Sequence, residues 1–186
     1  MKKYIYTVMF ILMSITLAQA QRMLPKQKGL EVNAGILSDD RIGDDYYINI
    51  GMTVNGKNGN YQLWALEYIH QFHNYKDFSI PIETYTAEGG YSFFLLSDTR
   101  KNITLNAGIT GVFGYESINR GEAVLYDGAK ILSEGNFIYG AGARISFETY
   151  LSDRFVLLLQ GRTKVFWGTD LQQFRPSAGI GLRFNF

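Results

Sequence analysis

Apolar and polar side chains alternate one by one along almost the entire chain after residue 28. Successive side chains of a β-strand point to opposite faces, so an alternation with a period of two predicts strands. The stretch 153–167 shows this best: Phe155, Leu157 and Leu159 fall on one face, and Gln160 and Arg162 fall on the other. No window in this part of the sequence has a sustained apolar stripe at helical spacing. We therefore expect an all-β fold.

Eight strands are predicted between segments of turn-forming residues. Their ranges are 29–37, 45–54, 60–73, 81–96, 101–115, 136–150, 153–167 and 174–186. Several reach or exceed the roughly 9–11 residues that a tilted strand needs to cross a bilayer, whereas soluble strands average about five or six. The 20 Gly, 13 Tyr and 13 Phe, with 3 Pro, also favour pleated strands with glycine at crowded positions. The prediction is an eight-stranded antiparallel up-and-down transmembrane β-barrel of the outer-membrane type.

The connections between the predicted strands alternate in length. Outer-membrane barrels have short periplasmic turns and longer external loops. Short connections with turn chemistry follow the even strands, at 55–60, 97–100 and 151–153. Longer and more polar connections follow the odd strands, at 38–45, 74–80, 116–135 and 168–174. With an even number of strands, both ends of the barrel are expected on the short-turn side, in the periplasm.

Residues 1–20 have the layout of a cleaved secretory signal. Two lysines precede an apolar run, and the small residues Ala18 and Ala20 fit the cleavage pattern. We expect a signal peptide at 1–20, an extended periplasmic segment at 21–28 and the barrel at 29–186. The chain has no cysteine, which excludes a lipidated N-terminal cysteine and any disulfide. Loss of Lys2 and Lys3 would change the formal charge from +1 to −1, which is not typical of a nucleic-acid-binding protein.

The polar face of the predicted strands carries acidic and basic side chains in equal number. They are Glu31, Glu67, Glu88, Arg144, Glu148, Arg162, Lys164 and Arg183. The interior of an eight-stranded barrel is just wide enough for side chains to fill, so charges there must pair or cost several kcal/mol each. Glycines on the same face, such as Gly35 and Gly179, leave room for the long side chains. We expect a structural network of ion pairs in the lumen and no wide aqueous pore.

The last strand is predicted to place Leu182, Phe184 and Phe186 on the outward face. A terminal aromatic strand of this form resembles the signal by which outer-membrane barrels are handed to the insertion machinery, so Phe184 and Phe186 are assigned that role. Other aromatic residues near strand ends are expected to form girdles at the two membrane surfaces. These are Tyr46, Tyr61, Phe72, Tyr91, Tyr115, Tyr150, Phe155 and Trp167.

Catalytic candidates are few. The chain has 2 histidines, of which His70 is predicted to lie on the outward face and His73 near an external connection. A site of Ser79, His73 and Asp77 is conceivable, because loop residues can converge. No nucleophile elbow or paired-histidine metal spacing supports it. We expect no enzyme activity, no catalytic or metal-binding residues and no cofactor.

Several stretches of the chain are distinctive. They are QRMLPKQKGLEVNAG from Gln21, VNGKNGNYQLWALEY from Val54, YTAEGGYSFFLL from Tyr85, YDGAKILSEGNFIYGAG from Tyr126, ETYLSDRF from Glu148 and GRTKVFWGTDLQQFRPSAGIGLRFNF to Phe186. From Gln21 to Phe186 the chain resembles the TraO family of conjugative-transposon proteins from Bacteroides and its relatives. The resemblance implies an outer-membrane component of an apparatus, similar to type IV secretion, that moves a conjugative element between cells. The family implies no catalytic residues.

The expected role is an anchor or docking barrel in the outer membrane of a Gram-negative bacterium. Its expected partners are other transfer proteins, the barrel insertion machinery and outer-membrane lipid, without sequence-specific binding of nucleic acid. Eight strands enclose too narrow a channel to conduct DNA. Two alternatives stay open: a stand-alone surface or adhesin-type small barrel similar to OmpX or OmpA, and a lipid-modifying enzyme.

Overall fold

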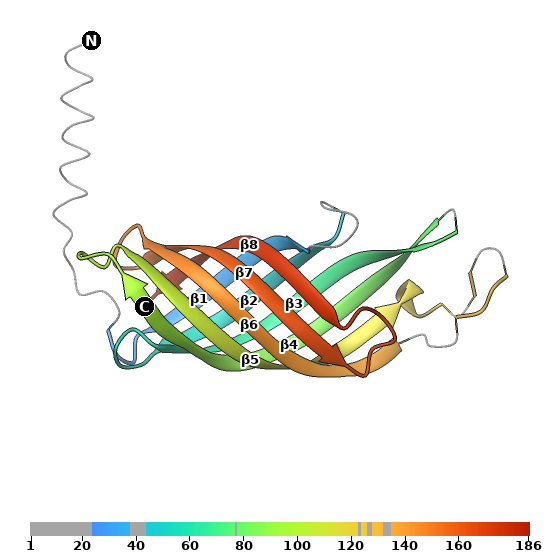
Figure 1. Ribbon diagram of the computed structural model, residues 1–186, viewed down its shortest axis with the longest axis horizontal. Coiled ribbons are helices and arrows are strands. Elements are labelled where there is room, and N and C mark those ends of the chain that lie inside the picture. The colour runs from blue at the N-terminus through green and yellow to red at the C-terminus, as the bar shows by residue number, and fades with distance from the viewer. Residues whose placement is uncertain (1–23, 38–43, 77, 123, 126–127, 132–134) are drawn as a thin grey trace, which may run out of the picture.

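The chain forms a closed antiparallel β-barrel, which confirms the predicted fold class. The computed structural model describes residues 24–37, 44–76, 78–122, 124–125, 128–131 and 135–186. The strands are β1 (Lys28–Leu37), β2 (Tyr46–Asn55), β3 (Tyr61–Tyr75), β4 (Phe78–Ser97), β5 (Ile103–Ile118), β6 (Gly135–Tyr150), β7 (Phe155–Trp167) and β8 (Phe174–Asn185). Each strand pairs with its neighbours in sequence, and β1 pairs with β8 to close the sheet. The strands run obliquely to the long axis of the barrel (Figure 1).

The two faces of the sheet have opposite chemistry. Outward side chains are apolar and exposed, as at Leu66 and Phe113, both 68% exposed. Inward side chains are polar and buried, as at Glu31 and Arg183, which are 0% and 1% exposed. This is the reverse of a water-soluble barrel, and it is the arrangement in which lipid surrounds the exterior. No helix within the described ranges is long and apolar enough to cross a membrane.

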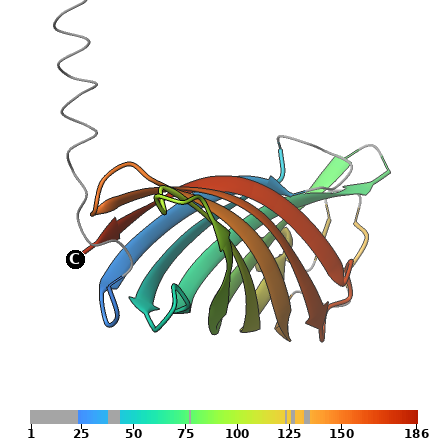
Figure 2. The same cartoon turned by 60° about the vertical axis from the view of Figure 1, so that its left-hand side comes forward.

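The connections sort to the two ends of the barrel. The turns after β2, β4 and β6 lie at the end that holds the C-terminus, as the sequence predicts (Figures 1 and 2). At the opposite end, the predicted loop at 74–80 is wrong. The strands β3 and β4 continue through it and pair as far as Tyr75 and Phe78. Polar residues such as Asn74 and Ser79 favour a loop, although backbone pairing of a hairpin does not require apolar side chains.

The connection between β5 and β6 also starts later than predicted. The strand β5 runs to Ile118 and is followed by a short 3₁₀-helix, η1 (Asn119–Gly121). Residues 116–118, predicted to begin the loop, therefore belong to the barrel wall. The consequence is that Glu116 lies inside the barrel and is fully buried.

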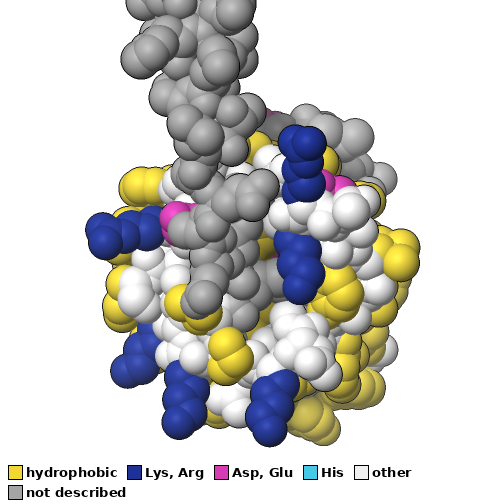
Figure 3. Space-filling view, turned by 90° about the vertical axis from the view of Figure 1, so that its left-hand side faces the viewer, with side chains coloured by type: hydrophobic (Ala, Val, Ile, Leu, Met, Phe, Trp, Pro, Cys, Tyr) yellow, Lys and Arg dark blue, Asp and Glu magenta, His cyan; other side chains and the backbone are white. Residues whose placement is uncertain are grey.

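The described residues before β1 form a turn. The predicted signal 1–20 and residues 21–23 lie outside the described residues. In place of the extended conformation predicted for 21–28, residues 24–27 form a turn in which the N–H of Lys26 donates to the carbonyl oxygen of Asn55 (2.7 Å). The N–H of Asn55 donates in return to Gln27 (2.8 Å). An end-on view shows basic side chains around this end of the barrel (Figure 3).

Two facing glycines mark the seam where the barrel closes. Gly35 of β1 lies opposite Gly179 of β8, and a Cβ atom at Gly35 would collide with the carbonyl oxygen of Ala178. Gly35→Ala is expected to lower the free energy of unfolding by about 1–3 kcal/mol, because backbone cannot move aside within a paired sheet. Gly161→Ala is the control, since a Cβ there meets nothing within 4 Å. Urea titrations of the refolded barrels measure both, and equal effects would contradict this account.

Candidate functional site

The first lumen cluster joins charges from β1, β6 and β8 near the C-terminal end of the barrel. The Arg183 guanidinium donates to Glu31 Oε2 from Nη2 (2.9 Å) and to Glu148 Oε2 from Nη1 (2.8 Å). Arg144 forms a longer ion pair with Glu31 (3.5 Å). The Tyr61 hydroxyl donates to Glu148 (2.6 Å) and accepts from Arg144 (2.8 Å). Two carboxylates and two guanidiniums thus neutralise one another around one phenol.

The second lumen cluster occupies the middle of the barrel. Glu67 of β3 pairs with Arg162 (2.6 Å) and with Lys164 (2.7 Å) of β7. Glu88 of β4 pairs with the same Lys164 (3.2 Å). The Arg162 guanidinium also lies over the Tyr47 ring, 3.8 Å from its centroid. These side chains reach across the lumen, since β3 and β7 are not neighbours in the sheet.

The third lumen cluster lies towards the opposite end and was missed by the sequence analysis. Arg175 pairs with Glu116 (2.6 Å), and Glu116 also accepts from the Thr169 hydroxyl (2.7 Å). Both charged side chains are buried. The alternation in the sequence does predict that both side chains face the lumen. Arg175 has the same parity as Arg183 in β8, and Glu116 has the same parity as Asn106 in β5.

The structure places all eight predicted lumen residues inside the barrel, and each forms at least one ion pair. With Glu116 and Arg175, the three clusters contain five carboxylates and five cations. Buried charges in this arrangement stabilise only as a complete set, since an unpaired member is left without water. The geometry therefore describes an interior in which ion pairs brace opposite walls of the barrel.

The predicted aromatic girdle is partly wrong. Tyr61 and Tyr150 face the lumen and are 2% and 7% exposed. Both lie near strand ends, as a girdle residue would, but their parity puts them with the polar face. Outward rings do cluster at the strand ends. The contacts are Tyr46 with His70, Tyr115 with Phe137, Tyr139 with Trp167, and Phe155 with Phe184.

The terminal aromatic residues lie on the outside, as their position in the alternation predicts. Phe184 is 36% exposed and Phe186 is 63% exposed, and their rings are stacked with centroids 6.4 Å apart. Phe186 also pairs with Lys28 through its backbone, so the end of the chain is held at the β1–β8 seam. Their service as an insertion signal stays a prediction.

The catalytic candidates do not converge. His73 lies opposite Ile80 in the β3–β4 hairpin, whereas Ser79 lies opposite Asn74. Residues 73 and 79 therefore point to opposite faces of the hairpin. The Ser79 hydroxyl donates to Asn74 (3.4 Å). Asp77 lies outside the described residues.

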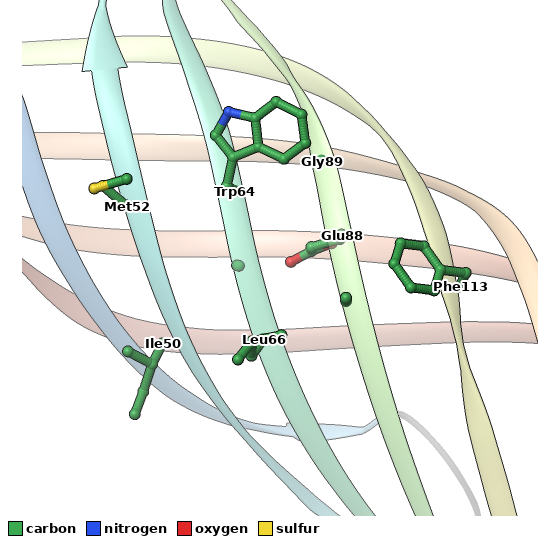
Figure 4. A pocket seen from close by; sticks show the side chains of 9 residues that line it. Ile50, Met52, Trp64, Leu66, Glu88, Gly89 and Phe113 are labelled. Atoms are coloured by element: carbon green, nitrogen blue, oxygen red, sulfur yellow. The ribbon is translucent and has the colours of Figure 1, made fainter.

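An open hollow of about 360 Å³ lies on the outer face of β2–β5. Its lining includes Ile50, Trp64, Gly89 and Phe113 (Figure 4). Glu88 also contributes to the lining, but its carboxylate points to the lumen, where it pairs with Lys164 (3.2 Å). The hollow lies on the apolar outer face, which a barrel of this kind presents to lipid.

Comparison with known proteins decides the family. Residues 24–186 match the family described as conjugative transposon protein TraO. The chain belongs to the TraO family. The match covers every strand of the barrel, so TraO membership describes the whole fold rather than one part of it. Among curated proteins, nothing matches the chain significantly.

Solved structures show what kind of barrel this TraO protein is. Neisserial surface protein A has 13% identity and a TM-score of 0.56, with 86% of this chain and 95% of that chain covered. Ail, the attachment invasion locus protein of Yersinia pestis, has 9% identity and a TM-score of 0.56, with 88% and 100% covered. At such identities the likeness shows the fold alone, which is that of the small eight-stranded outer-membrane barrels.

Proposed function

We propose that this TraO protein is the outer-membrane anchor or docking barrel of a conjugative transposon's transfer apparatus, and that it is neither a DNA conduit nor an enzyme. Family membership identifies it as a conjugative transposon protein. The apolar exterior and the outward aromatic clusters at the strand ends support residence in the outer membrane. The C-terminus and the short turns would then face the periplasm, where other transfer proteins operate.

The filled lumen carries the anchor part of this proposal. The three lumen clusters cross-link opposite walls, as Lys164 of β7 does with Glu67 of β3 (2.7 Å). Opening a passage for single-stranded DNA would require breaking several buried ion pairs, each worth several kcal/mol when only one partner is released. Eight-stranded barrels are also too narrow for such a passage once side chains fill them. A barrel built this way is suited to hold a position in the membrane.

The proposal is tested by deleting the gene in a donor that carries the element. Transfer is expected to fall to the background of a donor without the element and to return with the wild-type chain. A chain lacking Phe186 is expected to restore neither transfer nor the amount of barrel in the outer membrane, because the terminal aromatic residue closes the β1–β8 seam. Undiminished transfer in the deleted donor would refute the proposed function.

A stand-alone surface protein is the second candidate. The observation in its favour is the β3–β4 hairpin, which projects past the other strands at the end opposite the C-terminus (Figure 1). The two solved barrels compared above are also named as surface or attachment proteins. Under this reading the deletion would leave transfer intact and alter the interaction of the cell with surfaces.

A further inference from the structure

The end of the barrel that holds the C-terminus is strongly basic. Its exposed cations are Lys26, Lys28, Lys57, Arg100, Lys101 and Arg154. None of these six forms an ion pair with another described residue. The acidic groups at this end are Asp98, Asp153 and the carboxylate of Phe186. Among the described residues at the other end, exposed charges of both signs are present: the acids Asp44, Glu122 and Asp170, and the cations Lys76, Arg120 and Lys130. The excess of positive charge is therefore a feature of the C-terminal end.

Four of the cations lie in turns beyond the strand ends, and we call Lys26, Lys57, Arg100 and Lys101 the basic tips. Lys26 and Lys101 have positive φ angles of 70° and 54°, which places them at the corners of tight turns. All four side chains are exposed. Lys28 and Arg154 differ, because Lys28 lies in β1 and Arg154 immediately precedes Phe155, on the outward aromatic face.

Hydrogen bonds from backbone N–H groups to backbone and side-chain oxygens connect the segments that carry the basic tips. The N–H of Lys26 donates to Asn55 at the start of the β2–β3 turn (2.7 Å), and Asn60 at its end accepts from the N–H of Phe94 in β4 (2.8 Å). Within the β4–β5 turn, Asp98 accepts from the N–H groups of Lys101 and Ile103 (both 3.0 Å). Three adjacent segments thus present four cations on a fixed frame. An end-on view shows the basic side chains distributed over this face (Figure 3).

We propose that the basic tips are a docking surface for an acidic polypeptide segment of a periplasmic transfer protein; the proposal rests on the proposed function. Charge complementarity favours an acidic partner. Because hydrogen bonds already order the turns that carry the basic tips, little conformational entropy of these turns is lost on binding. A single-stranded nucleic acid fits less well, because binding it without sequence preference uses aromatic rings on which bases stack. The turns 55–60 and 97–102 carry no aromatic residue and are rich in asparagine.

Two double variants with the same change of charge test the surface. Lys57→Gln with Arg100→Gln removes two basic tips, and neither position has a positive φ angle. Lys28→Gln with Arg154→Gln removes the two cations at the lipid boundary. Purified barrels in zwitterionic nanodiscs are titrated with a fluorescent 20-residue poly-glutamate. The tip variant is expected to bind about tenfold more weakly, the boundary variant like the wild type, and wild-type binding is expected to weaken with added salt.

The same variants are tested in the donor beside the gene deletion. The tip variant is expected to lower transfer about tenfold at an unchanged amount of inserted barrel, while the boundary variant transfers normally. If the deletion abolishes transfer and the tip variant transfers normally, the docking proposal falls and the proposed function stands. If the deletion changes nothing, the proposed function falls, and the docking of a transfer protein falls with it.

Two further probes assign the surface to another occupant if the proposal is wrong. If an oligothymidylate binds the wild type as tightly as poly-glutamate or more tightly, and the tip variant loses this binding, the surface is a nucleic-acid surface. If phosphatidylglycerol in the nanodisc stabilises the wild-type barrel more than the tip variant, the surface is a lipid contact. Either result overturns the docking proposal.

Discussion

Replacing Arg183 by methionine is expected to lower the free energy of unfolding by about 3–5 kcal/mol. This guanidinium donates to both Glu31 and Glu148, and all three side chains are at most 1% exposed. Without it, two buried carboxylates share the single cation Arg144, which pairs weakly with Glu31 at 3.5 Å. The hydrophobic methionine leaves the volume largely filled, so the loss reports charge rather than a cavity.

Denaturant titration of barrels refolded into liposomes measures this effect. The double variant Arg183→Met with Glu148→Gln restores the charge balance of the cluster and is expected to recover about half of the loss. Recovery in the double variant is the sign of coupling, since independent sites would add their losses. A loss below about 1 kcal/mol for Arg183→Met would mean that water screens these charges, and would contradict a lumen braced by buried ion pairs.

Leu159→Arg is expected to cost about 2–4 kcal/mol, or to prevent insertion, because Leu159 lies on the outward face in the middle of β7. Its neighbours across the strands are Phe147 and Ile180, which are themselves outward and exposed. An arginine there would place an unpaired charge in the hydrocarbon region.

Leu151→Arg is the matched control for this substitution. Both leucines are 57% exposed, but Leu151 lies in the β6–β7 turn, where its N–H donates to Phe155. A charge at the membrane surface costs only about 0–1 kcal/mol. The comparison therefore separates the position along the membrane normal from exposure itself. Liposome insertion and denaturant titration measure both variants, and equal costs would show that the apolar exterior does not face lipid.

Arg183→Met and Leu159→Arg probe opposite faces of the barrel wall. In a soluble barrel, a buried arginine with two carboxylates would be an anomaly and an exposed leucine stripe would be an aggregation hazard. In this barrel the apolar side chains contact lipid instead of one another in a core, and the polar side chains are enclosed in the lumen instead of facing water. Stability then depends on electrostatic pairing inside and on apolar continuity outside, which is why each substitution is expected to act strongly.

Much of the fold could be predicted from the sequence because strand side chains alternate strictly. The parity of Phe155, Leu157 and Leu159 against Gln160 and Arg162 assigned both faces of β7 correctly. The predictions that are wrong depart from parity. Tyr61 is aromatic and near a strand end, which favours the girdle, and Glu116 directly follows the strand predicted at 101–115. The parity of each residue places it inside, where it is buried.

The parity of residues along each strand is a local property, and by itself the sequence determined which side chains face lipid and which face the lumen. Only the tertiary structure decided which charges meet. Arg183 and Glu31 are 152 residues apart and come together because β8 pairs with β1. Lys164 meets Glu67 across the lumen, at a distance that closure and the stagger of the strands fix. Closure and stagger are set by the register of all eight strand pairs at once, so no single segment of the sequence contains them.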